Sequence, residues 1–233
     1  MKVAIHQPQF LPWLGYVDKI DRADLFVLLD CVQFKKNEWQ NRNRIRTADG
    51  WQWMTVPVLH DFGQRIKDVR INDRVEWRAK HLRALDMHYA RSAYRTHVVR
   101  GLRALYKQSW ERLSDLNVAV LRWLLREFGI TTPLRLSSEM RLPEEPTERL
   151  IEICRAVGAT SYLAGAGAAG YMDLAKFEAA GIPVEVQEFH TPVYRQCYEP
   201  FVPGLSAIDL LLTCGGDSIQ SLRSTRTEGR KRG

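Results

Sequence analysis

Short apolar runs alternate with stretches of helical spacing along the chain, which is the rhythm of an α/β protein. Residues 3–7 read as a strand, and residues 13–23 read as a helix with one apolar face. Residues 25–29 form a continuous apolar run, which is typical of a buried parallel strand. The chain therefore opens with a predicted βαβ unit, and such units have a right-handed crossover.

The rest of the chain continues this alternation. We predict further strands at residues 51–56, 66–71, 134–136, 160–163 and 183–189. We predict helices at residues 76–107 with a break near Ser92 or Gly101, at 115–128 behind an N-cap at Ser114, and at 145–158, 171–180 and 205–212, the last started by Ser206. The helical block at about residues 76–128 reads as an insertion or a subdomain.

These elements predict a Rossmann-like, mostly parallel sheet within one α/β domain over residues 1–222. A chain of 233 residues is long enough to bury one full-sized core. Residues 223–233 carry four arginines and one lysine, and we expect them to form a basic, disordered tail.

Composition excludes several classes of protein. No apolar run approaches the length that spans a bilayer, so we expect no membrane insertion. The first residues lack the apolar region of a signal peptide and the four cysteines are widely spaced, which together predict a cytoplasmic protein with reduced thiols. The six histidines show no metal-ligand spacing with cysteines or carboxylates, so we expect no metal site.

The net charge of +7 raises the question of nucleic acid. The charge is spread through helical stretches and the tail, and it does not form one patch along the sequence. We therefore expect a small-molecule substrate, with anionic groups facing the surplus arginines, and no specific nucleic-acid site.

Candidate chemistry begins at the first loop. His6 ends the first predicted strand, where open α/β sheets bind their ligands, and two prolines preset the loop that follows. Gly15 would let the backbone approach a ligand closely. We expect His6 to act as a catalytic base, with substrate-binding groups at Gln7, Trp13 and Tyr16. The alternative is a structural histidine that is hydrogen-bonded beneath the loop.

A second polar and aromatic cluster follows the strand at residues 25–29. Asp30 is a candidate catalytic residue, and amides, arginines and tryptophans offer binding groups at Gln33, Trp39, Asn41, Arg42, Arg44 and Trp53. The alternative is a polar surface loop that is anchored by a tryptophan. Cys31 lies beside Asp30, and a small buried thiol is a commoner outcome there than a nucleophile.

Three further places fit an enzyme. His81 follows Lys80 and shares a helix face with Trp77, so it is a candidate catalytic base or ligand, with a helix-packing histidine as the alternative. The small-residue loop 165–170 would place Gly165 beside a phosphate or a carboxylate, or would be a close-packed turn. Two later side chains would line the same pocket or seal the core, namely Tyr194 and Gln196.

A longer pattern runs through these residues. Its N-terminal part comprises Ile5-His6-Gln7-Pro8, Leu11-Pro12-Trp13-Leu14-Gly15-Tyr16, Asp18-Lys19-Ile20, Phe26-Val27, Val32-Gln33-Phe34, Trp39-Gln40-Asn41-Arg42-Asn43-Arg44-Ile45 and Trp51-Gln52-Trp53-Met54-Thr55-Val56-Pro57. Its later part comprises Lys80-His81, Tyr162-Leu163-Ala164-Gly165, Tyr194, Gln196 and Ile208-Asp209. In these residues the chain resembles the WbqC-like family over almost its full length. It departs from the family pattern at Cys31, where an aspartate is expected.

The resemblance implies a small-molecule biosynthetic enzyme of bacterial surface-polysaccharide or natural-product pathways. Such an enzyme would transfer an acyl or aminoacyl group to an amine or hydroxyl. Arg42, Arg44 and Lys80 would hold an anionic donor, and Gln33 and Asn41 would orient polar groups. An acyl- or aminoacyl-carrier protein is the macromolecular partner that a basic surface suits. The resemblance specifies no cofactor.

Two alternatives stay open. The strand–loop–helix opening is similar to that of nucleotidylyltransferases in Phe10, Pro12 and Gly15, although Trp13 and Tyr16 stand near the two histidine positions of that motif. This similarity supports the topology, and it keeps ATP-dependent nucleotidyl transfer or adenylating ligation as the first alternative. The second alternative is a ligand- or carrier-protein-binding module without catalysis.

Overall fold

A five-stranded parallel sheet forms the centre of the molecule. The computed structural model describes residues 1–167, 170 and 172–228. Its sheet has the order β7-β2-β1-β8-β9, and every neighbouring pair is parallel. The strands are β1 (Lys2–His6), β2 (Leu25–Leu28), β7 (Leu134–Leu136), β8 (Ser161–Ala164) and β9 (Val184–Val186). The predicted Rossmann-like sheet with a βαβ opening is confirmed.

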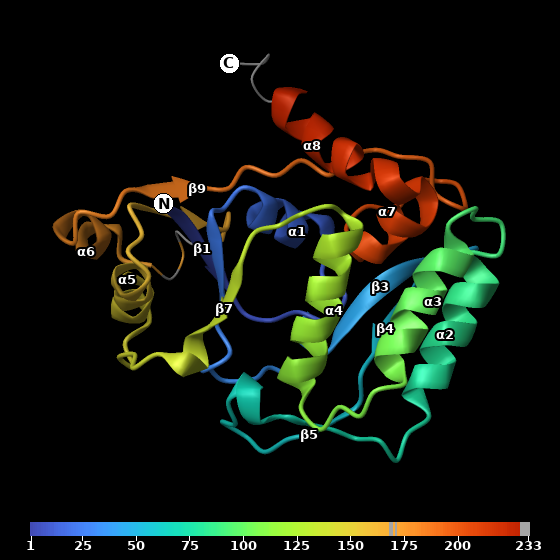
Figure 1. Ribbon diagram of the computed structural model, residues 1–233, viewed down its shortest axis with the longest axis horizontal. Helices are drawn as coiled ribbons and strands as arrows, with labels where there is room; N and C mark the ends of the chain where they lie inside the picture. The colour runs from blue at the N-terminus through green and yellow to red at the C-terminus, as the bar shows by residue number, and fades with distance from the viewer. Residues whose placement is uncertain (168–169, 171, 229–233) are drawn as a thin grey trace.

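Helices cover both faces of this sheet (Figure 1). One face carries α1 (Leu14–Asp21) and α4 (Leu113–Glu127), and the other carries α5 (Pro146–Ala156) and α6 (Leu174–Ala179). Successive strand residues point to opposite faces. The side chains on the α1 side are Ala4, Phe26 and Leu28, and those on the other side are Val3, Ile5, Leu25 and Val27. Burial on both faces explains the continuous apolar runs of β1 and β2.

The strand order reverses between β1 and β8. The chain first places β2 and β7 on one side of β1, and then returns to place β8 and β9 on the other side. Ligands of open α/β sheets bind at such a switch point, outside the carboxyl ends of the strands. The pairing of β1 with β2 runs to His6↔Leu28, whereas the pairing with β8 stops at Ala4↔Leu163. The two strands therefore part before β1 ends.

A hairpin and a helical block lie between β2 and β7 in the sequence. The antiparallel pairs are β3 (Arg42–Thr47) with β4 (Gly50–Thr55), and β5 (Val58–Leu59) with β6 (Arg70–Ile71). The block comprises α2 (Trp77–His88), α3 (Arg95–Tyr106) and α4, and its first two helices stand beside the hairpin in Figure 1. The helical insertion expected at about residues 76–128 is confirmed, and α4 joins it to the sheet.

In this region one strand was not predicted, and one predicted strand was wrong. The sequence pattern does not predict β3, because three of its six residues are arginine. The strand predicted at residues 66–71 is the 3₁₀ helix η1 (Ile66–Asp68) followed by the two residues of β6. Its apolar residues are buried at Ile66, Val69 and Ile71, so their spacing reflects core contacts of an irregular segment.

Helix ends agree with the sequence only in part. The expected break falls around Ser92, between α2 and α3, while Gly101 lies inside α3. The N-cap predicted at Ser114 is wrong, because α4 begins at Leu113 behind Arg112 and no side chain caps it. Two other elements are shorter than predicted, namely α6, which starts at Leu174, and β9; Tyr171 lies outside the described residues.

The last elements pack against the start of the chain. Ser206 caps α7 (Ala207–Cys214) through Ile208 N as predicted, and η4 (Gly215–Asp217) leads into α8 (Ser218–Glu228). The prediction of a disordered tail from residue 223 is wrong for residues 223–228, because they belong to α8. Residues 229–233 lie outside the described part. Among the described residues, no helix is long and apolar enough to cross a bilayer.

Candidate functional site

His6 stands at the carboxyl end of β1, beside the switch point. Its Nδ1 lies 3.2 Å from the carbonyl oxygen of Gln7, and its ring meets Tyr16 edge-on with centroids 5.1 Å apart. Burial and, to a smaller extent, the nearby charge of Lys19 together lower the pKa of His6 to about 4. The imidazole is therefore neutral at pH 7. With Nδ1–H donating to Gln7, Nε2 keeps a free lone pair, and no group in the described part of the chain bonds it.

Lys19 is the functional candidate that the sequence analysis missed. It projects from α1 and is 2% exposed, and its Nζ donates a 3.0 Å hydrogen bond to the carbonyl oxygen of Ile5. Burial lowers the pKa of Lys19 to about 7. A β-carbon added at Gly165, just after β8, would lie 3.8 Å from this Nζ. One sequence signal existed: Lys19 follows Tyr16 by three residues, so the two share a helix face.

Gln7 is fixed from two directions. Tyr16 donates its hydroxyl to the carbonyl oxygen of Gln7 at 3.1 Å, and Gln40 Nε2 donates to Gln7 Oε1 at 2.8 Å. Gln40 is held in turn by Asn117, whose Nδ2 donates to its carbonyl oxygen at 2.8 Å. Burial raises the pKa of Tyr16 well above its ordinary value, so this hydroxyl stays a donor at neutral pH. We call His6, Gln7, Tyr16, Lys19 and Gly165 the His6 group.

Gly15 has a different role from the one predicted. A β-carbon there would lie 2.3 Å from the indole ring of Trp13, so the ring fills the space that was expected to admit a ligand. The same ring meets Phe189 edge-on with centroids 5.4 Å apart. Trp13 therefore packs over Gly15 at the amino end of α1. The prediction that a ligand approaches the backbone at Gly15 is wrong.

Asp30 lies at the carboxyl end of β2 and is 2% exposed. Its carboxylate accepts hydrogen bonds from Ser137 Oγ at 2.9 Å, from Ser138 N at 2.9 Å and from Ser138 Oγ at 2.7 Å. Both serines belong to η2 (Ser137–Glu139), directly after β7. The Cys31 thiol lies 3.2 Å from Ser137 Oγ. This arrangement ties the ends of β2 and β7 together, and no hydrogen bond in the described part of the chain joins Asp30 to His6.

The hairpin presents tryptophans and arginines on its outer face. Arg42 Cζ lies 4.0 Å from the centroid of the Trp53 ring, and Arg44 Cζ lies 4.9 Å from that of Trp51. Trp51 and Trp53 meet edge-on at 5.3 Å, and they are 42% and 38% exposed. We call this set, with Trp39 at 6.1 Å from Trp53, the tryptophan–arginine surface. Its exposed indoles next to cations suit a sugar ring that carries an anionic group.

This surface begins close to the His6 group. Trp39 precedes Gln40, whose side chain is bonded to Gln7. The carbonyl oxygen of Trp39 also accepts a 3.0 Å hydrogen bond from the backbone N–H of Phe10. The structure therefore connects the predicted binding residues Gln7, Tyr16 and Gly165 with the predicted group Trp39, Arg42, Arg44 and Trp53.

His81 makes no hydrogen bond or ring contact with the His6 group in the described part of the chain. Its two ring nitrogens are 3.0 Å from the Tyr106 hydroxyl and 3.1 Å from the carbonyl oxygen of Thr55, and burial lowers the pKa of His81 to about 4. This geometry is that of the helix-packing histidine named as the alternative. Lys80 is exposed on the same helix. The catalytic role of His81 remains a prediction without a contact to His6.

Four other predicted binding residues have local partners. Asn41 Nδ2 donates to the carbonyl oxygen of Val56 at 3.1 Å, and Gln33 is exposed in an isolated bridge with Arg65. Tyr194 and Gln196 both bond to one carboxylate oxygen of Asp209, at 2.7 and 3.2 Å. Burial raises the pKa of Asp209, and the Tyr89 hydroxyl bonds its other oxygen at 2.5 Å. Tyr194 and Gln196 thus seal the core around Asp209.

The hollows given by the described residues include no member of the His6 group. One hollow of about 370 Å³ is lined by Leu174, Phe177, Ile182 and Val184 of the α6–β9 region, and it includes no member of the His6 group. Over residues 1–167, 170 and 172–228, no cluster of three or more His, Cys, Asp and Glu side chains could hold a metal ion.

The molecule is thus an α/β protein with a parallel sheet and a polar group at its switch point. The model of the WbqC-like protein family matches residues 7–221, and the chain belongs to this family. It is also 36% identical over 229 residues to the uncharacterised protein Rv1507c of Mycobacterium tuberculosis, a match that covers 97% of this chain and 99% of that protein. No solved structure matches the chain. The family resemblance in the sequence is confirmed.

Proposed function

We propose that this protein is a transferase of small-molecule biosynthesis, which moves an acyl or aminoacyl group to an amine or hydroxyl of a sugar or natural-product intermediate. The observation that supports this most directly is the neutral His6 ring, whose Nε2 has no hydrogen-bond partner among the described residues and lies where open α/β sheets bind ligands. His6 would act as the general base of the reaction.

The transfer step moves one proton and exchanges one bond. The amine or hydroxyl of the acceptor attacks the acyl carbon of a thioester donor, and its proton passes to His6 Nε2. The bond between the acyl carbon and sulfur then breaks, and the proton passes to the departing thiolate. His6 therefore holds the proton only between two steps, which a ring with a low pKa can do.

The tryptophan–arginine surface supports a sugar acceptor. Apolar faces of sugar rings pack on exposed indoles, and guanidinium groups bind carboxylates or phosphates. Trp53 is 38% exposed with Arg42 stacked on it, so both kinds of contact are offered within one patch. The patch is joined to Gln7 through Gln40.

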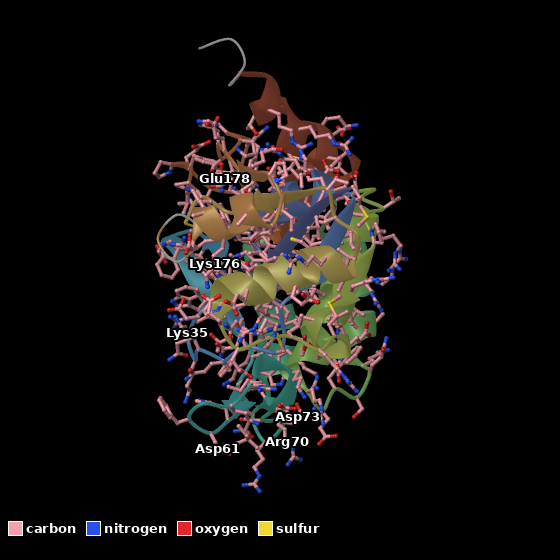
Figure 2. The ribbon with its side chains drawn as sticks, turned by 90° about the vertical axis from the view of Figure 1, so that its left-hand side faces the viewer. Lys35, Asp61, Arg70, Asp73, Lys176 and Glu178 are labelled. Carbon is pink, nitrogen blue, oxygen red and sulfur yellow. The ribbon has the colours of Figure 1, made fainter. Side chains whose placement is uncertain are left out.

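A carrier protein is the donor partner that we propose. Lys35 and Lys36 are exposed, and Figure 2 shows Lys35 at the surface, on the side of the molecule that carries α5 and α6. The backbone N–H of Lys35 donates to Gln40 Oε1 at 3.0 Å, and Gln40 in turn bonds Gln7. Cations at the rim of the site, in a chain with net charge +7, complement an acidic carrier. The free cysteines are compatible with a reducing cytoplasm.

The test measures thiol release. Purified protein is incubated with coenzyme A thioesters or carrier-protein thioesters and with amino-sugar acceptors, and the free thiol is titrated. The variant His6→Asn keeps a donor for the Gln7 carbonyl but lacks the Nε2 lone pair, so turnover falls by about 100-fold or more. His97→Asn, on the exposed face of α3, is the matched control and keeps turnover. A folded His6→Asn protein with full turnover contradicts the proposal.

ATP-dependent chemistry is the second candidate, and the strand order favours it. A sheet that reverses its order at the first strand binds nucleotides in many enzymes of this architecture. Stabilisation against heat by ATP alone, without any effect of thioesters, would support nucleotidyl transfer or adenylating ligation. Tight binding of ligands without turnover would instead support a binding module.

A further inference from the structure

β1 loses one of its two neighbours before it ends. Its register with β2 extends through His6, but its register with β8 stops at Ala4↔Leu163. Beyond that point the carbonyl oxygen of Ile5 accepts a hydrogen bond from Lys19 Nζ. The Lys19 side chain from α1 therefore bonds the backbone of β1 where its pairing with β8 has stopped.

The Lys19 ammonium has N–H donors beyond the one that bonds the Ile5 carbonyl. An ammonium group carries three N–H donors, and within the described part of the chain it makes one hydrogen bond and no ion pair. The neighbouring Asp18 does not neutralise it, because that carboxylate is bonded by Gln187 and Arg226. A buried cation without a partner costs stability, so a structural role alone explains it poorly.

The end of β8 keeps the place beside Lys19 Nζ free of a side chain. Gly165 has no β-carbon, and one added there would lie 3.8 Å from Nζ. Gly165 is partly exposed and Gly167 is exposed, so oxygen atoms of a ligand can reach this backbone. The lone pair of His6 belongs to the same end of the sheet.

We infer that Lys19 binds a phosphate group of the donor at the carboxyl ends of β1 and β8. Nζ keeps its contact with the Ile5 carbonyl and gives its other N–H groups to the phosphate oxygens. A phosphate suits this place because its several oxygens can accept hydrogen bonds from a buried ammonium and from nearby backbone N–H groups at once. The inference shares the site of the proposed function, and phosphate binding does not require that acyl transfer occurs.

Inorganic sulfate is the first probe, because it stays doubly charged across the pH range where Lys19 titrates. Calorimetric titrations compare sulfate, AMP, coenzyme A and acetate with the wild-type chain. Lys19→Met keeps a side chain of similar length without charge and weakens binding of the first three by about tenfold or more. Lys176→Met is the matched control, since Lys176 lies on the surface of α6 (Figure 2), and it leaves affinity unchanged. Affinity for sulfate falls as the pH rises through about 7.

Two glycine variants and the unfolding temperature of Lys19→Met control for misfolding. Gly165→Ala adds a methyl group next to Lys19 Nζ at an ordinary contact distance, whereas Gly167→Ala adds one in open space. The first variant weakens sulfate binding and the second does not. Lys19→Met removes a buried ammonium, so its unfolding temperature stays equal to or above that of the wild type. A folded Lys19→Met chain that binds sulfate like the wild type overturns the inference, and so does acetate binding as tight as sulfate binding.

The two proposals fail in different ways. Binding of AMP or coenzyme A that requires Lys19, without thiol release in any assay, keeps the phosphate site and removes the transferase. Thiol release that survives Lys19→Met but not His6→Asn keeps the transferase and removes the phosphate site. Tighter binding of coenzyme A than of AMP identifies a pantetheine-linked donor, and the reverse order identifies a nucleotide.

Discussion

Two histidines, the partly buried His6 and the buried His81, are held in their neutral form by the fold. Burial lowers the pKa values of His6 and His81 from 6.5 to about 4. Between about pH 4 and pH 6.5 the unfolded chain therefore binds protons on these histidines that the folded chain does not bind. The contribution of each ring to stability is therefore fully present above pH 6.5 and is lost as the pH falls through the folded pKa.

We predict a steep loss of stability in weak acid. The free energy of unfolding falls by up to about 1.4 kcal/mol per pH unit for each histidine between pH 6.5 and 4. Urea unfolding at several pH values measures this slope. His81→Gln can still donate to Thr55 and accept from Tyr106, but it does not titrate, so its slope is shallower by one proton. Equal slopes for the variant and the wild type would show that His81 does not contribute.

Single residues also show where sequence reasoning ends. His6, Gln7 and Tyr16 were predicted as a group because a strand end and a proline loop mark them. Lys19 was not, because a lysine on an amphipathic helix is normally solvated, and its burial depends on β8, more than 140 residues away in the chain. The burial of Arg46 was not predicted for the same reason, since Arg46 bonds the distant carbonyl oxygen of Pro200.

At the scale of elements, α8 is fastened to α1 by ion pairs. Arg226 Nε donates to Asp18 Oδ1 at 2.7 Å, and this carboxylate is 1% exposed. Arg223 binds Asp21 at 2.7 Å, but its own side chain is 53% exposed. Because α1 carries both Tyr16 and Lys19, these contacts also support the His6 group.

We predict unequal costs for the two arginines. Arg226→Ala leaves the Asp18 carboxylate buried with fewer donors and lowers the free energy of unfolding by about 1–3 kcal/mol. Arg223→Ala removes an ion pair whose arginine is half exposed, and Arg226 still binds Asp21 at 2.8 Å, so the free energy of unfolding falls by less than about 1 kcal/mol. Urea unfolding of both variants, with Asp18→Asn completing a double-mutant cycle, measures the difference. Equal losses would mean that apolar contacts such as Leu222 hold α8 instead.

The elements that the sequence predicted best are those with an apolar period. β1, β2 and α5 follow from their own residues, since each has a buried run or a buried stripe. β3 carries arginine on its outward positions and again at the buried Arg46, so no period of two appears in hydrophobicity. Its pairing with β4 is set by the hairpin and by burial of Asn43 and Ile45 on the inner face.

The whole molecule has one continuous core on the α1 side of the sheet. The cluster that contains Phe26 and Leu28 also contains Leu85 of α2, Leu102 of α3 and Leu121 of α4. The helical block therefore shares its apolar interior with the sheet. Its removal would expose the face of the sheet that α4 covers.

We predict a single unfolding transition. Tryptophan fluorescence reports the hairpin and the helical block, through residues such as Trp53, Trp77 and Trp123, whereas far-UV circular dichroism reports all elements. Because the hairpin, the helical block and the α1 side of the sheet share one core, both signals change at the same urea concentration. A separate fluorescence midpoint would show that the block unfolds as an independent subdomain.

The order of the strands is a property of the whole molecule that the sequence pattern did not specify. The parallel class followed from the apolar runs, but the pairing of β1 with β8 joins Lys2 to Ser161. Contacts of this range leave no local signal, so the switch point could be located only from the fold.

The attachment of α8 also orders events during synthesis of the chain. Asp18 and Arg226 are 208 residues apart, so a ribosome has made nearly all of the described chain before this ion pair can close. Until then α1 can pack on the sheet, but Asp18 lacks Arg226. The helix α1, which carries Lys19, is thus synthesised early but gains its ion pair with α8 only near the end of synthesis. A prematurely terminated product that lacks α8 would lack this ion pair, and its α1 would be more open to cellular proteases.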